Sequence, residues 1–207
     1  SADFVICFAR NEKKRILPFL VSVDDIQMKN FSLIDDQSVS QLFLKDVKVS
    51  KDCLLRYKKD ILLDLYVKAV AFLSAEAVSI MKVLNEKTKQ YLKDREQFGK
   101  PLSKFQVLQH RLVEMYVQEE QARSMSLALN FALSSQERSL DLLRFSHMVK
   151  LKINDYSQYI GEQSVQLHGG MGVSDELDVA HYFRRLTCIR HQFGDQLSCL
   201  SNLVDFL

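Results

Sequence analysis

The chain has 207 residues, of which 47% are hydrophobic and 26% are charged, a composition typical of a folded globular protein rather than a disordered one. Its 28 Lys and Arg side chains nearly balance its 26 Asp and Glu side chains, so the strong positive charge of a nucleic-acid-binding protein is absent. The longest apolar runs are short and interrupted by charged residues, which predicts no membrane span.

The cysteines and histidines lack the spacing of metal sites. Cys7, Cys53, Cys188 and Cys199 contain no CxxC pair, and the five histidines are scattered along the chain. We interpret the cysteines as free thiols in a reducing compartment, which predicts a cytoplasmic protein without a bound metal.

Residues 1–52 have the features of β-strands. Apolar runs at 4–9 and 16–23 are separated by the charged stretch 10–15, and Pro18 suits an edge strand. The segment 41–49 alternates in its second half, as a half-buried strand does. Because two or three strands do not form a stable sheet alone in water, we interpret residues 1–52 as the C-terminal part of an incomplete β domain.

From about residue 54 the apolar period becomes helical. In the first predicted helix, one row of positions (61, 65, 69, 72, 76, 80 and 84) runs beside a second (62, 66, 70, 73, 77 and 81), which gives a wide apolar stripe. The later pattern predicts a second helix over 103–134, a break at 134–137, a third helix whose apolar face runs from Leu142 to Leu167, a shorter helix over 175–185 and a helical tail over 195–207. Such wide stripes need partners on more than one side. The fold is therefore predicted to be mainly α, with residues 53–207 forming an antiparallel bundle of long helices after the partial β domain.

The first interruption of the helical pattern is the segment 94–102, Asp-Arg-Glu-Gln-Phe-Gly-Lys-Pro-Leu. Gly99 and Pro101 must break the helix, and Pro101 is well placed near the start of the next one. An arginine beside an aromatic residue on a rigid turn can bind a phosphate through two hydrogen bonds. Taken alone, the segment favours the simpler interpretation, a helix-terminating turn with a surface arginine.

The second interruption is the segment 166–172, Gln-Leu-His-Gly-Gly-Met-Gly. Consecutive glycines let a backbone approach a ligand closely, and their N–H groups can bind phosphate oxygens. The segment is not a P-loop, since no Gly-Lys-Ser/Thr follows, and not a Rossmann fingerprint, since it follows a helix. Taken alone, it favours a glycine-rich helix end.

Together and in this order, the two interruptions resemble the C-terminal part of the acyl-CoA dehydrogenase family. The matching residues are Arg95-x-Gln97-Phe98-Gly99-x-Pro101-Leu102-x-x-Phe105-Gln106 and Gln166-Leu167-x-Gly169-Gly170-x-Gly172. The resemblance continues in Ala75-Glu76, in the segment 180–184 and in the strand-like segments 2–6 and 46–49, so that it covers essentially the whole chain.

This resemblance implies a reaction, a cofactor and partners. Members of the family oxidise acyl-CoA thioesters at Cα–Cβ, passing a hydride to FAD while a glutamate removes the α-proton. Arg95, Gln97 and Phe98 match residues that contact the pyrophosphate and adenine half of FAD in a neighbouring subunit. A second loop that reaches the same flavin is matched by Gln166, Gly169 and Gly170. The resemblance therefore implies FAD sites completed between homologous subunits of a dimer or tetramer, with an electron-transfer flavoprotein as the expected acceptor.

The sequence departs from the family at the catalytic base. The usual glutamate aligns with Phe193, and the alternative position in the first long helix aligns with Ala69. Neither side chain can accept a proton, although general-base catalysis requires a titratable group within hydrogen-bond reach. The catalytic residue is therefore unknown from the sequence.

Two carboxylates remain as displaced candidates for the base. Asp195 is the nearest to the expected site and is a weak candidate, with His191 four residues earlier predicted as its partner on a helix surface. Glu76 is two turns from the alternative position and is interpreted as a structural or interface carboxylate. Arg185 also departs from the family, because an aspartate usually follows the residue that matches Arg184.

These observations predict a subunit of an acyl-CoA dehydrogenase-like hetero-oligomer. In this hypothesis the chain donates Arg95 and the 166–170 loop to the flavin of a partner that supplies the base. Paired subunits, one lacking the glutamate, occur among bacterial members that act on bulky steroid-derived acyl-CoA, and Phe193-Gly194 resembles the equivalent stretch in such subunits. The alternatives are a homo-oligomeric dehydrogenase with a displaced base and a non-enzymatic assembly subunit of the same fold. Because the family's helical N-terminal domain would precede Ser1, we expect either a fragment of a longer polypeptide or a chain that works beside another one.

Overall fold

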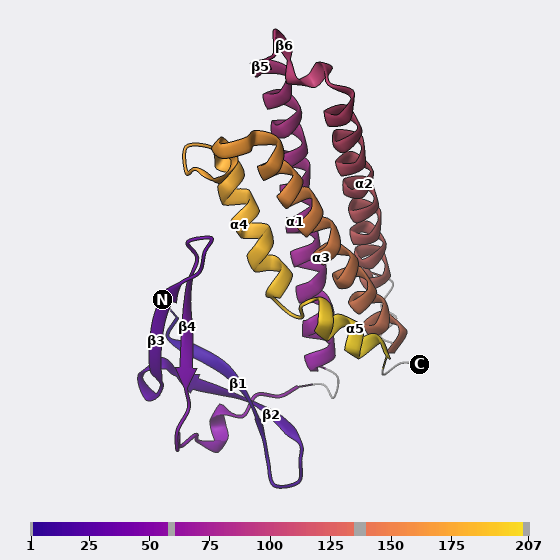
Figure 1. The fold of residues 1–207 in the computed structure, drawn as a ribbon. Coiled ribbons are helices and arrows are strands. Elements are labelled where there is room, and N and C mark those ends of the chain that lie inside the picture. The colour runs from indigo at the N-terminus through magenta and orange to yellow at the C-terminus, as the bar shows by residue number, and fades with distance from the viewer. Residues whose placement is uncertain (1, 58–60, 135–139, 205–207) are drawn as a thin grey trace. The chain divides into compact units, whose positions relative to one another are not determined.

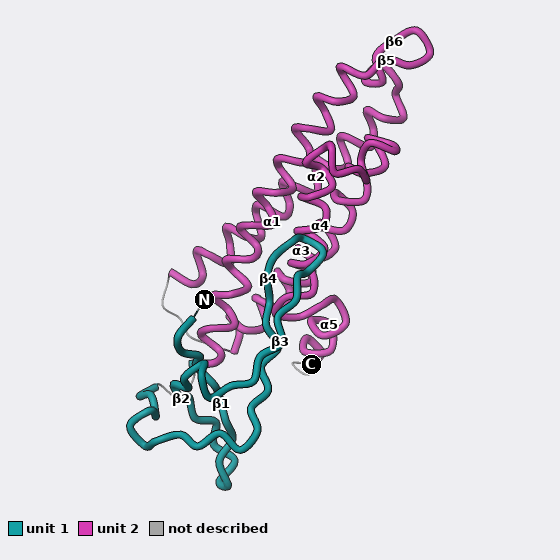
Figure 2. Tube along the Cα trace, turned by 90° about the vertical axis from the view of Figure 1, so that its left-hand side faces the viewer, with its two compact units in different colours: residues 1–61 teal, residues 62–207 magenta. Residues whose placement is uncertain are grey.

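A computed structural model describes residues 2–57, 61–134 and 140–204. The chain divides into two compact units, Ser1–Ile61 and Leu62–Leu207, coloured separately in Figure 2. The predicted boundary, between residues 52 and 53, lies somewhat earlier in the chain. Within the described ranges, no helix is long and apolar enough to cross a membrane.

The first unit consists of two antiparallel hairpins. One pairs β1 (Phe4–Arg10) with β2 (Ile16–Ser22), and the other pairs β3 (Gln27–Ser32) with β4 (Ser38–Phe43). Pro18 lies opposite Phe8 of β1, and its carbonyl accepts a hydrogen bond from Leu55 N at 3.0 Å. Because the carbonyl and the nitrogen of a strand residue point to the same side, the Pro18 nitrogen also faces away from β1, and its missing N–H removes no hydrogen bond between β1 and β2.

The prediction of a strand over 41–49 was wrong in its second half. β4 ends at Phe43, and Asp46 has a φ of +52°, a left-handed conformation that interrupts an extended backbone. β3 was not predicted because all six of its residues are exposed, so its sequence lacks the apolar alternation that marks a half-buried strand.

The second unit is a bundle of helices, as predicted. It contains α1 (Ile61–Asp94), α2 (Gln106–Ser134), α3 (Leu140–His168), α4 (Asp178–His191) and α5 (Gln196–Val204). The first four alternate in direction, so sequence neighbours run antiparallel in Figure 1. The predicted break at 134–137 lies, apart from Ser134, outside the described residues, as do the last three positions of the predicted tail.

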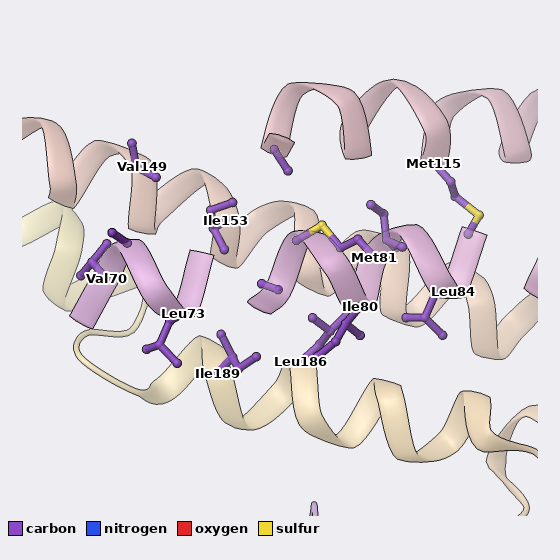
Figure 3. Packing of buried hydrophobic residues seen from close by; sticks show 14 of the residues in the cluster. Val70, Leu73, Ile80, Met81, Leu84, Met115, Val149, Ile153, Leu186 and Ile189 are labelled. Carbon is purple, nitrogen blue, oxygen red and sulfur yellow. The ribbon is translucent and has the colours of Figure 1, made fainter. Parts of the chain in front are cut away.

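The core of the bundle is built on both predicted rows of α1. Val70, Leu73, Ala77 and Met81 of the second row are buried, and so are Ile80 and Leu84 of the first row, whereas Phe72 of the first row is 78% exposed. Figure 3 shows residues of both rows beside Val149 and Ile153 of α3 and Leu186 and Ile189 of α4. Packing against α3 and α4 therefore decides how far along the helix each row is buried.

A buried polar network ties α3 to the turn between α4 and α5. The ammonium group of Lys150, a fully buried residue, donates to Asn154 Oδ1 at 2.6 Å and to Ile189 O at 2.9 Å. Asn154 Nδ2 donates to Gly194 O at 3.3 Å. The network thereby provides hydrogen-bond donors for carbonyls at the C-terminal end of α4, which have no intrahelical N–H donor.

Candidate functional site

The arginine motif forms a tight hairpin between α1 and α2. β5 (Glu96–Gln97) pairs with β6 (Lys100–Pro101), and the two turn residues, Phe98 and Gly99, have φ values of +56° and +76°. Two successive positive φ angles are the type I′ geometry of two-residue hairpins, which a glycine at the second position adopts without steric cost. Leu102 N donates to Arg95 O at 2.8 Å, so Arg95 lies at the base of a closed turn.

The glycine motif ends α3 and continues as the 3-10 helix Gly169–Val173. Gly169 has a φ of +61°, and a Cβ atom added at Gly169 or Gly170 would meet nothing within 4 Å. At Gly172 the same atom would lie 2.5 Å from Val165 O. Gly172 therefore allows the turn to pack closely on α3, while Gly169 and Gly170 present open backbone.

One pocket of about 600 Å³ brings the two motifs together. Arg95 and Gln97 line it from the hairpin, and the glycine motif contributes Gln166, Gly169 and Gly170. The predicted residue Phe98 is not among the lining residues: its ring is 89% exposed and contacts Phe105 edge-on, with the ring centroids 6.1 Å apart.

The lining of this pocket is positively charged. Arg95 is exposed, and within the described part of the chain its guanidinium has no hydrogen-bond or ion-pair partner. Arg111, near the start of α2, also lines the pocket, and its Nη1 lies 3.4 Å from Gln163 Oε1. No aspartate or glutamate occurs among the described lining residues, so the pocket suits an anion.

Three polar lining residues were missed by the sequence analysis: Tyr91, Arg111 and His168. Tyr91 precedes Arg95 by one helical turn, and this spacing would have placed it on the same side of α1. His168 directly precedes the two glycines. No local sequence pattern indicates a role for Arg111, because only the packing of α2 on α3 brings it to the pocket.

The expected base positions carry no titratable group. Phe193 is exposed in the turn between α4 and α5 and has a φ of +55°, and Ala69 is a half-buried residue of α1. Gly194, beside Phe193, is bound by Asn154, which precedes His168 by 14 positions on α3, or roughly 21 Å along the axis. The base position is therefore separate from the motif pocket.

Asp195 caps a helix. It precedes α5, and its Oδ1 accepts a hydrogen bond from Ser198 N at 2.8 Å, as an N-cap residue does. Hydrogen bonds from Ser198 lower the pKa of the Asp195 carboxyl, which makes it a weaker base. The prediction of a shared helix surface with His191 was wrong, because α4 ends at His191 and α5 begins after Asp195.

Glu76 is held in an ion pair between α1 and α4. Arg185 Nε lies 2.5 Å from Glu76 Oε1, and Arg185 Nη2 lies 2.9 Å from Oε2. Both carboxylate oxygens thus accept from one guanidinium, which supports a structural role for Glu76. Arg185, at which the sequence departs from the family, is therefore the ion-pair partner of this carboxylate.

Comparisons with known proteins agree with this architecture. The family model for the C-terminal domain of acyl-CoA dehydrogenases matches residues 69–196. The acyl-CoA dehydrogenase IpdE2 of Mycolicibacterium smegmatis is 30% identical over 117 residues, which are 56% of this chain and 35% of the relative. This chain thus spans about a third of the length of that curated relative.

Solved structures match nearly the entire chain. The butyryl-CoA dehydrogenase of Megasphaera elsdenii has a TM-score of 0.85 at 25% identity, over 99% of this chain and 56% of the solved one. The ChsE4–ChsE5 complex of Mycobacterium tuberculosis has a TM-score of 0.90 at 19% identity, over 99% of this chain and 55% of the solved one, a likeness of fold. Because the family model covers more than half of the sequence and both motifs lie within it, the chain belongs to the acyl-CoA dehydrogenase family.

Proposed function

We propose that this chain is a flavoprotein subunit that supports the FAD-dependent α,β-dehydrogenation of an acyl-CoA thioester by completing the FAD site of a homologous partner. The observation that carries the proposal is the single pocket lined by Arg95, Gln97, Gln166, Gly169 and Gly170. In addition, neither Phe193 nor Ala69 carries a group that can accept a proton, so we assign proton abstraction to the partner.

The residues of the pocket fit the pyrophosphate and adenine half of FAD. Arg95 offers a guanidinium that has no partner among the described residues and can donate two parallel hydrogen bonds to a phosphate, and Arg111 adds a second positive charge. The open backbone at Gly169 and Gly170 lets a ligand approach closely. When bound, FAD would supply the acceptor for the hydride that leaves Cβ of the thioester.

The other parts of the proposal follow from the relatives. IpdE2 and the butyryl-CoA dehydrogenase are named for acyl-CoA dehydrogenation, and one solved neighbour is a complex of two different proteins, ChsE4 and ChsE5. A hetero-oligomer that degrades lipid or steroid acyl-CoA is therefore the proposed assembly, with an electron-transfer flavoprotein as acceptor. We place it in the cytoplasm, in agreement with four cysteines that form no disulfide within the described part of the chain.

The test is flavin binding by the full-length protein, purified alone and with the product of the neighbouring reading frame. Arg95→Ala should lower the flavin absorbance of the complex while leaving its helical circular dichroism unchanged, because the Arg95 side chain is exposed. Arg123→Ala, which removes an exposed arginine paired with Glu120 on α2, is the matched control.

The same preparations separate the alternatives through acyl-CoA-dependent dye reduction. Reduction by the chain alone would contradict a base supplied by a partner and favour a homo-oligomeric enzyme with a displaced base. Flavin absent from every combination would reject the proposal and leave a non-enzymatic assembly subunit of the same fold.

A further inference from the structure

We propose that Tyr91 is a positioning residue that holds the glycine turn of the pocket at a fixed place relative to Arg95. This inference rests on the proposed function, in which the pocket binds the diphosphate of a dinucleotide. It assigns a role in that binding to a tyrosine outside both sequence motifs.

Tyr91 contacts both motifs at once. Its backbone carbonyl accepts a hydrogen bond from Arg95 N at 2.9 Å, the last helical bond before the hairpin. Its hydroxyl donates to His168 O at 3.3 Å, the carbonyl that directly precedes Gly169. One side chain therefore joins the C-terminal end of α1 to the C-terminal end of α3.

His168 extends this connection into the glycine turn. Its ring lies 4.3 Å from the Tyr91 ring, centroid to centroid, and Nδ1 donates to Ser164 O at 2.7 Å. His168 is only 4% exposed, and burial lowers the pKa of its imidazole, which favours the neutral form of the ring that packs at a tilt on Tyr91. A Cβ added at Gly172 would lie 3.1 Å from His168 Cβ, so the following turn packs directly on this residue.

The connection matters because the two motifs belong to different helices. Between Arg95 and Gly169 the chain runs down α2 and back up α3, so no short segment sets their separation (Figure 1). A diphosphate bound by both needs the guanidinium and the glycine backbone at one spacing. A link that sets this spacing before binding removes an ordering cost that would otherwise weaken affinity.

The experiment measures ADP binding by calorimetry to the full chain in its native assembly with flavin removed. Tyr91→Phe keeps the ring stacked on His168 but removes the hydroxyl donor, and should weaken ADP binding about fivefold, the value of one ordinary hydrogen bond. Tyr159→Phe is the matched control. It also removes a tyrosine hydroxyl bond between two helices of the bundle, to Glu114 Oε2 at 2.5 Å, but Tyr159 does not line the pocket, and ADP affinity should stay unchanged.

A double-mutant cycle with Arg95→Ala separates positioning from general stability. Because Tyr91 acts by spacing the glycine turn from Arg95, Tyr91→Phe should cost less affinity when Arg95 is already absent. Equal losses in both backgrounds, or unchanged affinity in Tyr91→Phe, would overturn the positioning role while leaving the proposed function intact. A wild-type assembly that binds no ADP would instead overturn the proposed function and this inference with it.

Discussion

Arg111 gives the motif pocket a second guanidinium, which no motif of the sequence indicates. It lines the pocket with Arg95 and is held by Gln163 of α3 at 3.4 Å. A diphosphate carries charge on two phosphates, so two arginines that line one pocket can each donate to a different phosphate. The site is thus more cationic than the sequence motif alone suggests.

The prediction at this scale concerns Arg111→Met, which keeps much of the side-chain length and removes the charge. ADP affinity should fall about tenfold, in line with a hydrogen bond to a charged group, and should become less sensitive to added salt. Titrations at two salt concentrations measure both effects. Arg123→Met, on the exposed surface of α2, should change neither quantity. An unchanged salt dependence in Arg111→Met would show that this arginine does not contact the phosphates.

Among the elements, the contact between α3 and the end of α4 depends on a buried charge. Lys150 is fully buried and donates to neutral oxygens of Asn154 and Ile189. Burial is the main cause that lowers the pKa of its ammonium group to about 8. The charged form is therefore disfavoured in the folded bundle relative to the unfolded chain.

This pKa predicts how stability changes with pH. Between about pH 8 and the ordinary lysine value near 10.5, the unfolded chain binds more protons at residue 150 than the folded chain does. The Lys150 contribution to the free energy of unfolding should therefore rise with pH in this window, by at most about 1.4 kcal/mol per pH unit. Urea unfolding at pH 8 and pH 10 measures this slope.

The matched variant for this measurement is Lys150→Met. It retains the buried aliphatic length and should lose the rise, so the difference between the two proteins isolates residue 150 from the tyrosines that also titrate at high pH. Identical slopes for wild type and variant would contradict a depressed lysine pKa.

At the scale of the whole molecule, α2 is apolar on two faces. Met115, Ala122 and Leu129 are buried in the bundle, whereas a second row of apolar residues points away from it and is exposed: Val113, Tyr116, Val117, Leu127 and Phe131. These positions recur at helical spacing on one outer stripe of the helix, which Glu120 and Ser124 interrupt between Val117 and Leu127. Exposed apolar side chains gathered on one face of a helix are typical of a subunit interface, in agreement with the proposed homologous partner.

The corresponding prediction is that Phe131→Glu weakens the assembly. Phe131 is 78% exposed, so a carboxylate there should leave the bundle folded but become buried and unpaired at an interface. Light scattering should report a smaller mass at micromolar concentration, with unchanged helical circular dichroism. Phe131→Leu keeps the stripe apolar and should keep the assembly. A mass unaffected by the glutamate would place the interface elsewhere.

Much of this protein could be predicted from its sequence because its helices are long and strongly periodic. The break at Gly99 and Pro101 and the apolar faces of α2 and α3 were confirmed, since glycine, proline and helical spacing act locally. β3 was missed because an exposed hairpin leaves no apolar pattern, and the second half of the predicted strand over 41–49 was wrong because β4 ends at Phe43 and Asp46 is left-handed.

By itself, the sequence determined the helical bundle, the two motif turns and the lack of a base at Phe193 and Ala69, because each depends on residue type or short-range spacing. Only the tertiary structure decided how far along α1 each apolar row is buried, that Asp195 caps α5, that Glu76 pairs with Arg185, and that Tyr91 and Arg111 share a pocket with both motifs. These features join residues from different helices or depend on where a helix ends. Helical periodicity leaves such choices open until the helices pack against one another.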